Sequence, residues 1–176
     1  TANRVIELEM GDKNLVSVDM DIPELEPAKI PFEATEKAFL YPIEVDGQSY
    51  QVAAVSMGNP HAVLNVDDIA TAPVAELGAK IESHQRFPNR VNVGFMQIVN
   101  RNEIKLRVFE RGVGETEACG SGACAAAVAA LQQGLVDSPV TMQLTRGSLK
   151  IDWQGEGHGL IMTGPAATVF HGRIRI

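Results

Sequence analysis

The sequence predicts an α+β fold in which a mixed or antiparallel β-sheet wraps around one central helix. Most of the chain consists of short alternating or β-branched apolar runs separated by turn signals, a pattern typical of strands. Residues 121–133 are small and apolar on every side, which is typical of a helix enclosed by other elements. Residues 73–84 carry apolar side chains on one face only and predict one amphipathic surface helix.

The elements follow in order along the chain. Residues 5–10 and 15–20 alternate apolar and polar side chains around Gly11-Asp12-Lys13-Asn14, which predicts a hairpin. Residues 21–36 contain three prolines without periodicity, so we expect a linker or surface crossing there, and a domain boundary. The other expected strands are residues 38–45, 48–57, 61–66, 91–99 and 103–110 before the central helix, and 139–145, 148–153, 159–163 and 166–176 after it.

Composition limits the classes of partner. The chain has 176 residues, 45% of them apolar, and its formal net charge of −7 comes from acids and bases spread along its length. Without a basic stripe, we expect no nucleic-acid partner. No apolar run approaches the roughly 20 residues needed to cross a bilayer, so no membrane segment is expected. The two cysteines suggest no disulfide framework, and we expect a cytoplasmic protein with reduced thiols. The opening at Thr1, almost directly in a strand-like run, favours an excised piece.

The segment over residues 110–124 (ERGVGETEACGSGAC) carries the clearest chemistry. It places Cys119 at the start of the Ala-rich helix, where the N–H groups of Gly120, Ser121 and Gly122 can hold a carboxylate. The same position predicts a lowered pKa for the Cys119 thiol. A thiolate beside a carboxylate pocket can move a proton on the carbon α to that carboxylate, and the helix N–H groups would stabilise the charge that develops.

Cys124, inside the helix, is expected to be a packing residue. Two residues five apart on a helix point about 140° away from each other, so we expect neither a metal site nor a disulfide from the two cysteines.

Five further polar residues each have a structural and a functional interpretation. Asn59, within SMGNPH, suits either turn chemistry or ligand binding, and His61 is either a core histidine or a group that tunes a thiol. Asn92 would bond a ligand or a neighbouring strand. Glu110-Arg111 is either a solvated pair or a clamp for a zwitterion, because arginine binds carboxylates through two bonds and glutamate accepts from ammonium.

Taken together, GNPH at 58–61, VNVGF at 91–95, FERGVGETEACGSGAC at 109–124 and MTGPA at 162–166 strongly resemble the diaminopimelate epimerase family. The resemblance covers essentially the whole chain after residue 37. It implies conversion of LL-2,6-diaminopimelate to the meso isomer, on the bacterial route to lysine and peptidoglycan, with no cofactor. It also implies two similar halves, each a sheet wrapped on a central helix, with the site in the cleft between them, and a homodimer.

The resemblance also implies residue roles. Cys119 looks like one of two opposed catalytic cysteines, assisted by His61 and Glu110. Gly120 and Ser121 would bind the carboxylate at the reacting centre through backbone N–H groups. The residues expected to hold the distal amino-acid end are Asn59, Asn92, Glu110 and Arg111. Phe170 falls where the family has an aromatic residue at the dimer contact.

One departure from the family is important. The family's other catalytic cysteine lies in a C-G-N-G type segment of an N-terminal domain, and this sequence has no such segment. We therefore expect residues 1–20 to be strands that join the missing domain, 21–164 to form the C-terminal epimerase domain, and 165–176 to be a final strand returning toward the N-terminal domain. We expect this chain to be inactive alone.

Three alternatives remain. The protein could be a racemase or isomerase of another amino acid, of the proline racemase or phenazine-biosynthesis type. It could instead be a non-catalytic binding and dimerisation module. A cysteine hydrolase built on Cys119 and His61 is a more distant option, because no orienting third group is evident.

Overall fold

The computed structural model describes residues 7–11 and 14–175. Within these residues the two α-helices are α1 (Val74–Glu82) and α2 (Gly120–Gln132). The strands are β1 (Leu8–Met10), β2 (Leu15–Asp19), β3 (Tyr41–Val45), β4 (Gln48–Ser56), β5 (Pro60–Asn65), β6 (Asn92–Asn100), β7 (Glu103–Glu110), β8 (Gly114–Thr116), β9 (Val140–Leu144), β10 (Gly147–Trp153) and β11 (Leu160–Pro165). The expected strands between residues 38 and 163 agree with these bounds to within three residues.

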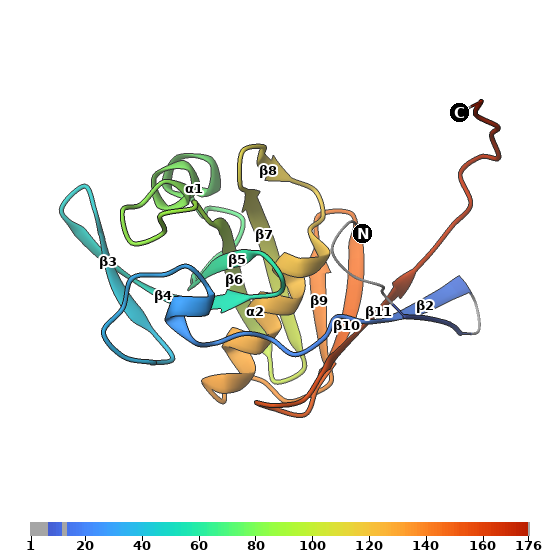
Figure 1. Cartoon of the computed structure of the whole chain (residues 1–176), viewed down its shortest axis with the longest axis horizontal. Helices are drawn as coiled ribbons and strands as arrows, with labels where there is room; N and C mark the ends of the chain where they lie inside the picture. Colours follow the sequence, from blue (N-terminus) through green and yellow to red (C-terminus); the bar gives the residue numbers. More distant parts are fainter. Residues whose placement is uncertain (1–6, 12–13, 176) are drawn as a thin grey trace.

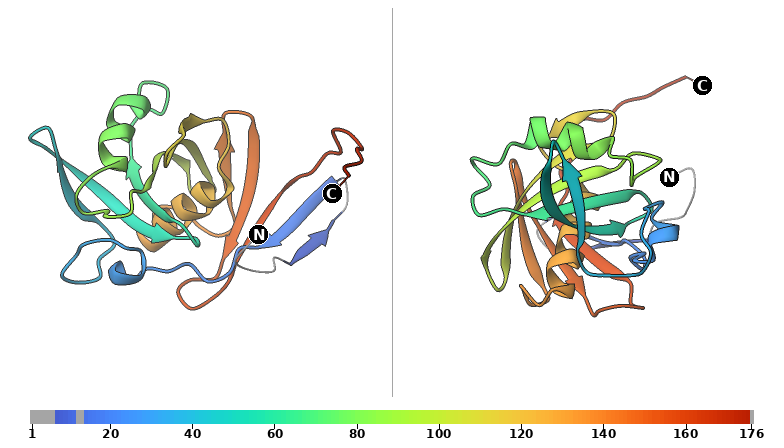
Figure 2. Two further views of the ribbon diagram at one scale, coloured as in Figure 1. Left: turned by 45° about the horizontal axis from the view of Figure 1, so that its top comes forward. Right: turned by 90° about the vertical axis from the view of Figure 1, so that its left-hand side faces the viewer.

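The strands form a mixed sheet. Their order is β1-β2-β11-β10-β9-β7-β6-β5-β4-β3, and β8 pairs with β7 beside this path. The β5–β6 and β7–β9 pairs are parallel, and the other neighbours are antiparallel. The β1–β2 hairpin lies at one end of the molecule and the β3–β4 hairpin at the other (Figure 2). The expectation of a mixed sheet with few helices is therefore confirmed.

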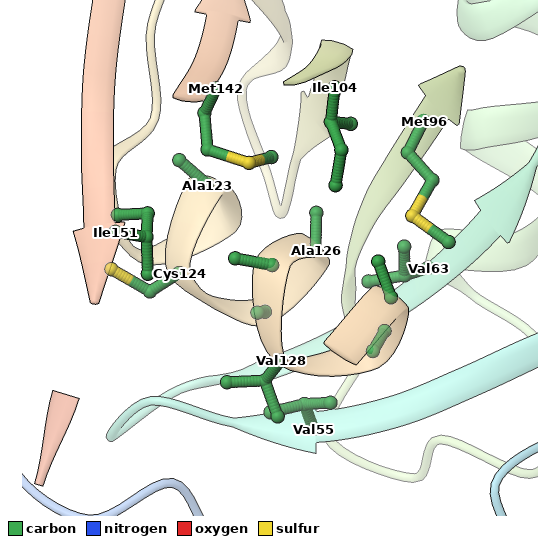
Figure 3. Packing of buried hydrophobic residues seen from close by; sticks show 14 of the residues in the cluster. Val55, Val63, Met96, Ile104, Ala123, Cys124, Ala126, Val128, Met142 and Ile151 are labelled. Carbon is green, nitrogen blue, oxygen red and sulfur yellow. The ribbon is translucent and has the colours of Figure 1, made fainter. Parts of the chain in front are cut away.

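Helix α2 lies in the larger apolar cluster. Nine of its residues are buried, and it contacts strands from both halves of the sheet order, including β4, β6 and β10. Figure 3 shows Val55, Ile104 and Ile151 converging on the helix from different strands. The alanines explain this position, because alanine is the strongest helix former and its short side chain allows close approach of neighbouring strands. The N-terminus of α2 is thereby fixed against the sheet.

The second apolar cluster lies on the opposite face of the sheet. In β4, Ala53 and Val55 pack in the α2 cluster, whereas Val52 and Ala54 pack in a cluster with α1. This alternation follows from the period of two in a strand, which sends successive side chains to opposite faces. Neither helix in the described part of the chain has the length and apolar character that a membrane span requires.

The proline-rich segment over residues 21–36, expected to be a linker or a surface crossing, crosses the surface and is anchored by buried apolar side chains, so it is not a free linker. Leu25 is buried in the α2 cluster, and Ile30 and Phe32 are buried in the α1 cluster. The Phe32 ring stacks on Phe87 with centroids 4.6 Å apart. The prolines support one turn of 3-10 helix at Pro27–Lys29. Apolar residues at irregular spacing, which carry no strand or helix period, hold this segment on both clusters.

The two ends of the chain differ from each other. Strands β1 and β2 form the predicted hairpin, although residues 5–6 and 12–13 of that prediction lie outside the described residues, and β2 pairs with β11. Residues 166–175 do not form the predicted final strand over 166–176 within this chain and have no regular structure after β11 ends at Pro165, while the return of this segment toward an N-terminal domain stays a prediction. This segment leads away from the sheet (Figure 1). A strand needs a neighbouring strand for its ladder, and beyond the Leu15–Pro165 pair β2 offers none.

Candidate active site

Strands β5, β6 and β7 bring three of the expected site residues into one row. The parallel register pairs His61 with Asn92, and the antiparallel Val93–Phe109 pair places Glu110 next to Asn92. Residues two positions away on the same strands, such as Val63 and Val108, belong to the α2 cluster. Because side chains alternate along a strand, this row also faces α2.

Cys119 lies at the N-terminus of α2, where it is the residue that precedes the helix. Its backbone is extended, with φ −140° and ψ 106°, and its carbonyl accepts the first helical hydrogen bond from the Ala123 N–H at 2.9 Å. The thiol is 7% exposed, and its Sγ lies 3.7 Å from the Ser121 hydroxyl. The N–H groups of Gly120 and Ser121 are in the first helical turn, where the helix itself supplies no acceptor.

The prediction of a lowered pKa for Cys119 is wrong in this chain. Burial raises the pKa of the thiol, and the carboxylate of Glu110 raises it further. The Ser121 hydroxyl and the Gly122 N–H favour the thiolate, but they do not overcome the loss of water. Cys119 is therefore a protonated thiol at neutral pH, with a carboxylate close to it.

His61 is fully buried. Its Nε2 lies 3.1 Å from Asn59 Oδ1, and Nδ1 has no hydrogen-bond partner among the described residues. Burial, with a smaller contribution from the charge of Arg111, lowers the pKa of His61 to about 3. The imidazole is therefore neutral at physiological pH, and any assistance to a thiol would come from this neutral form. Asn59 also serves the turn before β5, because its carbonyl accepts from the Met57 N–H at 3.2 Å.

The remaining polar residues hold one another. Asn92 donates from Nδ2 to the Pro60 carbonyl at 2.9 Å and accepts from the Arg111 N–H at 3.0 Å, so its amide joins β5 to the turn after β7. Glu110 accepts from the Thr116 hydroxyl on β8. The Arg111 guanidinium donates to the Asn89 carbonyl at 3.0 Å. Glu110 and Arg111 thus have separate partners.

The structure therefore groups nearly all of the expected site residues around the N-terminus of α2 and the adjoining strand ends. They are Asn59, His61, Asn92, Glu110, Arg111, Cys119, Gly120 and Ser121. Phe170 is not part of this group and lies in the segment after β11, 80% exposed. In residues 7–11 and 14–175, no three His, Cys, Asp or Glu side chains lie close enough to hold a metal.

Two neighbours of the site were not expected from the sequence. Thr116 fixes the Glu110 carboxylate, and Met162 of β11 lies so close to Gly120 that a Cβ there would be 3.3 Å from its Sδ. Thr116 falls inside the conspicuous glycine-rich segment, which gave some signal. Met162 opens the MTGPA motif at 162–166, but its approach to Gly120 depends on how β11 pairs, so the sequence gave no sign of this contact.

Comparison with known proteins places the chain in a family. The sequence profile described as Diaminopimelate epimerase matches residues 53–169. Proteins named Diaminopimelate epimerase from Pseudomonas entomophila and Pseudomonas savastanoi pv. phaseolicola are 60% and 58% identical over 176 residues, covering 100% of this chain. The chain spans 64% of the length of these two relatives.

Solved structures agree on the fold. A probable proline racemase from Agrobacterium radiobacter has a TM-score of 0.65 at 14% identity, covering 93% of this chain and 54% of that chain. A hydroxyproline epimerase from Agrobacterium vitis has a TM-score of 0.58 at 14% identity, covering 91% of this chain and 53% of that chain. At such identities the likeness concerns the fold alone. On the profile match and the close sequence relatives, the chain belongs to the diaminopimelate epimerase family.

Proposed function

We propose that the complete protein converts LL-2,6-diaminopimelate to meso-diaminopimelate by a cofactor-independent mechanism with two thiols, and that this chain supplies one of them, Cys119. The observation that carries the proposal is the position of Cys119 immediately before a buried helix. There it lies beside the Glu110 carboxylate and beside the N–H groups of Gly120 and Ser121, to which the helix supplies no acceptor. A carboxylate bound by Gly120 and Ser121 would bring its α-carbon close to the thiol.

The protonation state of Cys119 suits one half of such a reaction. Burial and Glu110 hold the proton on the thiol, so Cys119 is ready to deliver it to one face of an α-carbanion. In the reverse direction, the thiolate left behind would take the α-proton from that face. The N–H groups of Gly120 and Ser121 would stabilise the charge that spreads into the substrate carboxylate. A second group on the opposite face must perform the complementary transfer if the centre is to invert.

Cys124 does not fit the role of that second group. Its side chain is completely buried in the α2 cluster, close to Ile151 (Figure 3), and burial raises its pKa to about 12. Cys119 and Cys124 are the two cysteines of the sequence. We therefore propose that the second thiol comes from the part of the protein outside this chain, and that this chain alone is inactive.

The distal end of the substrate would be held by four polar residues at or next to these strand ends. Asn59, Asn92, Glu110 and Arg111 combine amide, carboxylate and guanidinium groups, which match a zwitterion with a carboxylate and an ammonium. His61, neutral and buried, would assist the thiols together with Glu110. A substrate with an amino acid at both ends would use these four residues, whereas proline would not. This difference favours diaminopimelate over the related racemase reaction.

Location and assembly form part of the same proposal. Both thiols are free, which fits a reducing cytoplasm. In the complete protein the strands β1 and β2 and the segment from residue 165 would join the additional domain, and Phe170 would contact a second subunit in a homodimer.

A stereochemical assay of the complete protein tests the reaction and the substrate together. We expect LL-diaminopimelate to be converted to the meso isomer and L-proline to remain unchanged. Cys119→Ala should abolish conversion, and Cys124→Ala, the matched cysteine substitution, should leave kcat within about twofold. Conversion of proline but not of diaminopimelate would assign the protein to the related racemases. No turnover of either substrate by a folded complete protein would favour a binding module.

A further inference from the structure

Glu82 is a buried carboxylate outside the residues assigned above. It is the last residue of α1 and is 9% exposed. Its Oε1 accepts the Gly112 N–H at 2.6 Å, and Arg90 Nη1 lies 3.7 Å from the same oxygen. Burying a carboxylate is costly unless hydrogen bonds compensate it. The main-chain hydrogen bond from Gly112 is therefore an important part of what stabilises the Glu82 carboxylate at this position. The contact lies beside Arg111.

Gly112 belongs to the tight turn that carries Arg111. The Val113 N–H donates to the Glu110 carbonyl at 3.0 Å and closes the turn, and Gly112 has φ +75°, which favours glycine. The Arg111 N–H donates to Asn92 Oδ1 at 3.0 Å, and the next N–H, that of Gly112, donates to Glu82. Side chains from β6 and α1 therefore hold two successive N–H groups of this turn.

Glu82 also fixes the segment that receives the Arg111 guanidinium. Its backbone carbonyl accepts the Val91 N–H at 3.1 Å, two residues beyond Asn89, whose carbonyl accepts from Arg111 Nη1. Helix α1 packs closely on β7, because a Cβ on Gly78 would lie 2.7 Å from the Cβ of Phe109. Phe109 is the residue that precedes Glu110. The position of Glu82 relative to the turn is thus set by packing as well as by hydrogen bonding.

We propose that Glu82 is a positioning residue that orients Arg111 toward the carboxylate at the distal end of the substrate. This inference rests on the proposed function. Arginine recognises a carboxylate through a planar fork, so a small displacement of its backbone costs one or both hydrogen bonds. Glu82 thereby acts on recognition of the second amino-acid end and leaves proton transfer at Cys119 unaffected.

Kinetics of the complete protein test this role. We expect Glu82→Ala to raise KM for diaminopimelate about tenfold, while kcat changes by less than about twofold. Glu82→Gln keeps an oxygen acceptor for Gly112 and should hold KM within about threefold of the wild type. Glu76→Ala, on the exposed face of the same helix, is the matched control and should leave both parameters unchanged.

A double-mutant cycle separates positioning from general stabilisation. In an Arg111→Lys background, Glu82→Ala should raise KM by less than about twofold, because the planar guanidinium that Glu82 orients is no longer present. A full tenfold rise in that background, or a fall in kcat with KM unchanged, would overturn the proposal. If Glu82→Ala does not fold, the same cycle is run with Glu82→Gln, whose smaller rise in KM should likewise disappear in the Arg111→Lys background. A rise in KM of the same size in both backgrounds would overturn the proposal. A wild-type protein without diaminopimelate turnover would instead refute the proposed function, and faster amide exchange at Gly112 in Glu82→Ala would still report the contact.

Discussion

Cys119 and His61 both lose contact with water in the folded chain, and this loss moves their pKa values in opposite directions. The thiol pKa rises, because its charged form is the thiolate, whereas the imidazole pKa falls to about 3, because its charged form is the cation. Both side chains are therefore neutral near pH 7. Near the thiol lies the Glu110 carboxylate, which contributes to its raised pKa.

The buried imidazole predicts a pH dependence of stability. His61 titrates at about 3 when folded and at 6.5 when unfolded, so the unfolded state binds more protons between these values and stability falls as pH falls below 6.5. We expect a loss of about 2 kcal/mol between pH 7.5 and 5, at about 1.4 kcal/mol per pH unit. Urea unfolding of the chain at several pH values measures it.

Two variants identify the source of this pH dependence. His61→Gln should flatten the profile above pH 5, and His158→Gln, at an exposed turn, should leave it intact. The carboxylates Glu24 and Asp137 have lowered pKa values, so their contributions are lost only as pH falls below 4.5. An unchanged slope in His61→Gln would show that His61 is not the responsible group.

Which single residues could be found from sequence depends on how local their surroundings are. Cys119 and its glycine neighbours were predicted because the helix start and the motif are contiguous in the chain. The direction of the Cys119 pKa shift was not, because burial is decided by distant strands. Glu82 was also missed, since a glutamate at the end of an amphipathic helix gives no sign that its carboxylate turns inward to Gly112.

At the scale of elements, the two helices pack by different means. Helix α2 presents alanines on all sides and is surrounded by strands. Helix α1 packs one face on the sheet, with Val74, Leu77 and Ile81 buried. One glycine, which has no side chain, allows the helix to lie close to the sheet. Gly78 is that glycine, because the Phe109 ring occupies the space a side chain would need.

Gly78→Ala should therefore destabilise the chain although alanine favours helices. The added Cβ would lie 2.7 Å from Phe109 Cβ, and such overpacking costs about 1–3 kcal/mol, against a gain in helix propensity of about 1 kcal/mol. We expect a lower free energy of unfolding in urea. Ala75→Gly, on the exposed side of α1, measures the propensity alone. Stabilisation by Gly78→Ala would contradict the close packing of α1 on β7.

Strands were predictable where a segment has both a period of two and a partner. Residues 103–110 satisfy both conditions and match β7. Residues 166–175 show strand-like residues but have no partner in this chain, and residues 21–36 show no period yet are packed. Pairing and irregular packing depend on contacts between distant segments, so periodicity alone could not settle these two cases.

At the scale of the whole molecule, one end of the sheet is poorly covered. Leu8 and Met10 of the β1 edge are 64% and 72% exposed, and Val169 and Phe170 beyond β11 are 90% and 80% exposed. Large exposed apolar side chains, on an open sheet edge or on the segment that follows the sheet, are typical of a contact surface. The chain also spans 64% of the length of its close relatives, which agrees with the proposal that an additional domain of the complete protein covers this end.

The proposed dimer contact can be tested in the complete protein. Phe170→Ala should shift sedimentation velocity from a dimer toward a monomer, because a buried phenylalanine at an interface contributes about 2 kcal/mol or more. Phe39→Ala, which removes another exposed ring far along the chain at 58% exposure, should leave the dimer intact. A Phe170→Ala dimer of unchanged affinity would remove Phe170 from the interface.

The central claim is that Cys119 exchanges the α-proton of an amino-acid substrate and needs a second thiol outside this chain. Transfer of deuterium from heavy water to the α-carbon of diaminopimelate measures this most directly, for this chain, the complete protein and its Cys119→Ala and Cys124→Ala variants. We predict exchange by the complete protein and by Cys124→Ala, none by this chain, and a loss of at least about a hundredfold in Cys119→Ala. Undiminished exchange in Cys119→Ala, or exchange by this chain alone, would contradict the account.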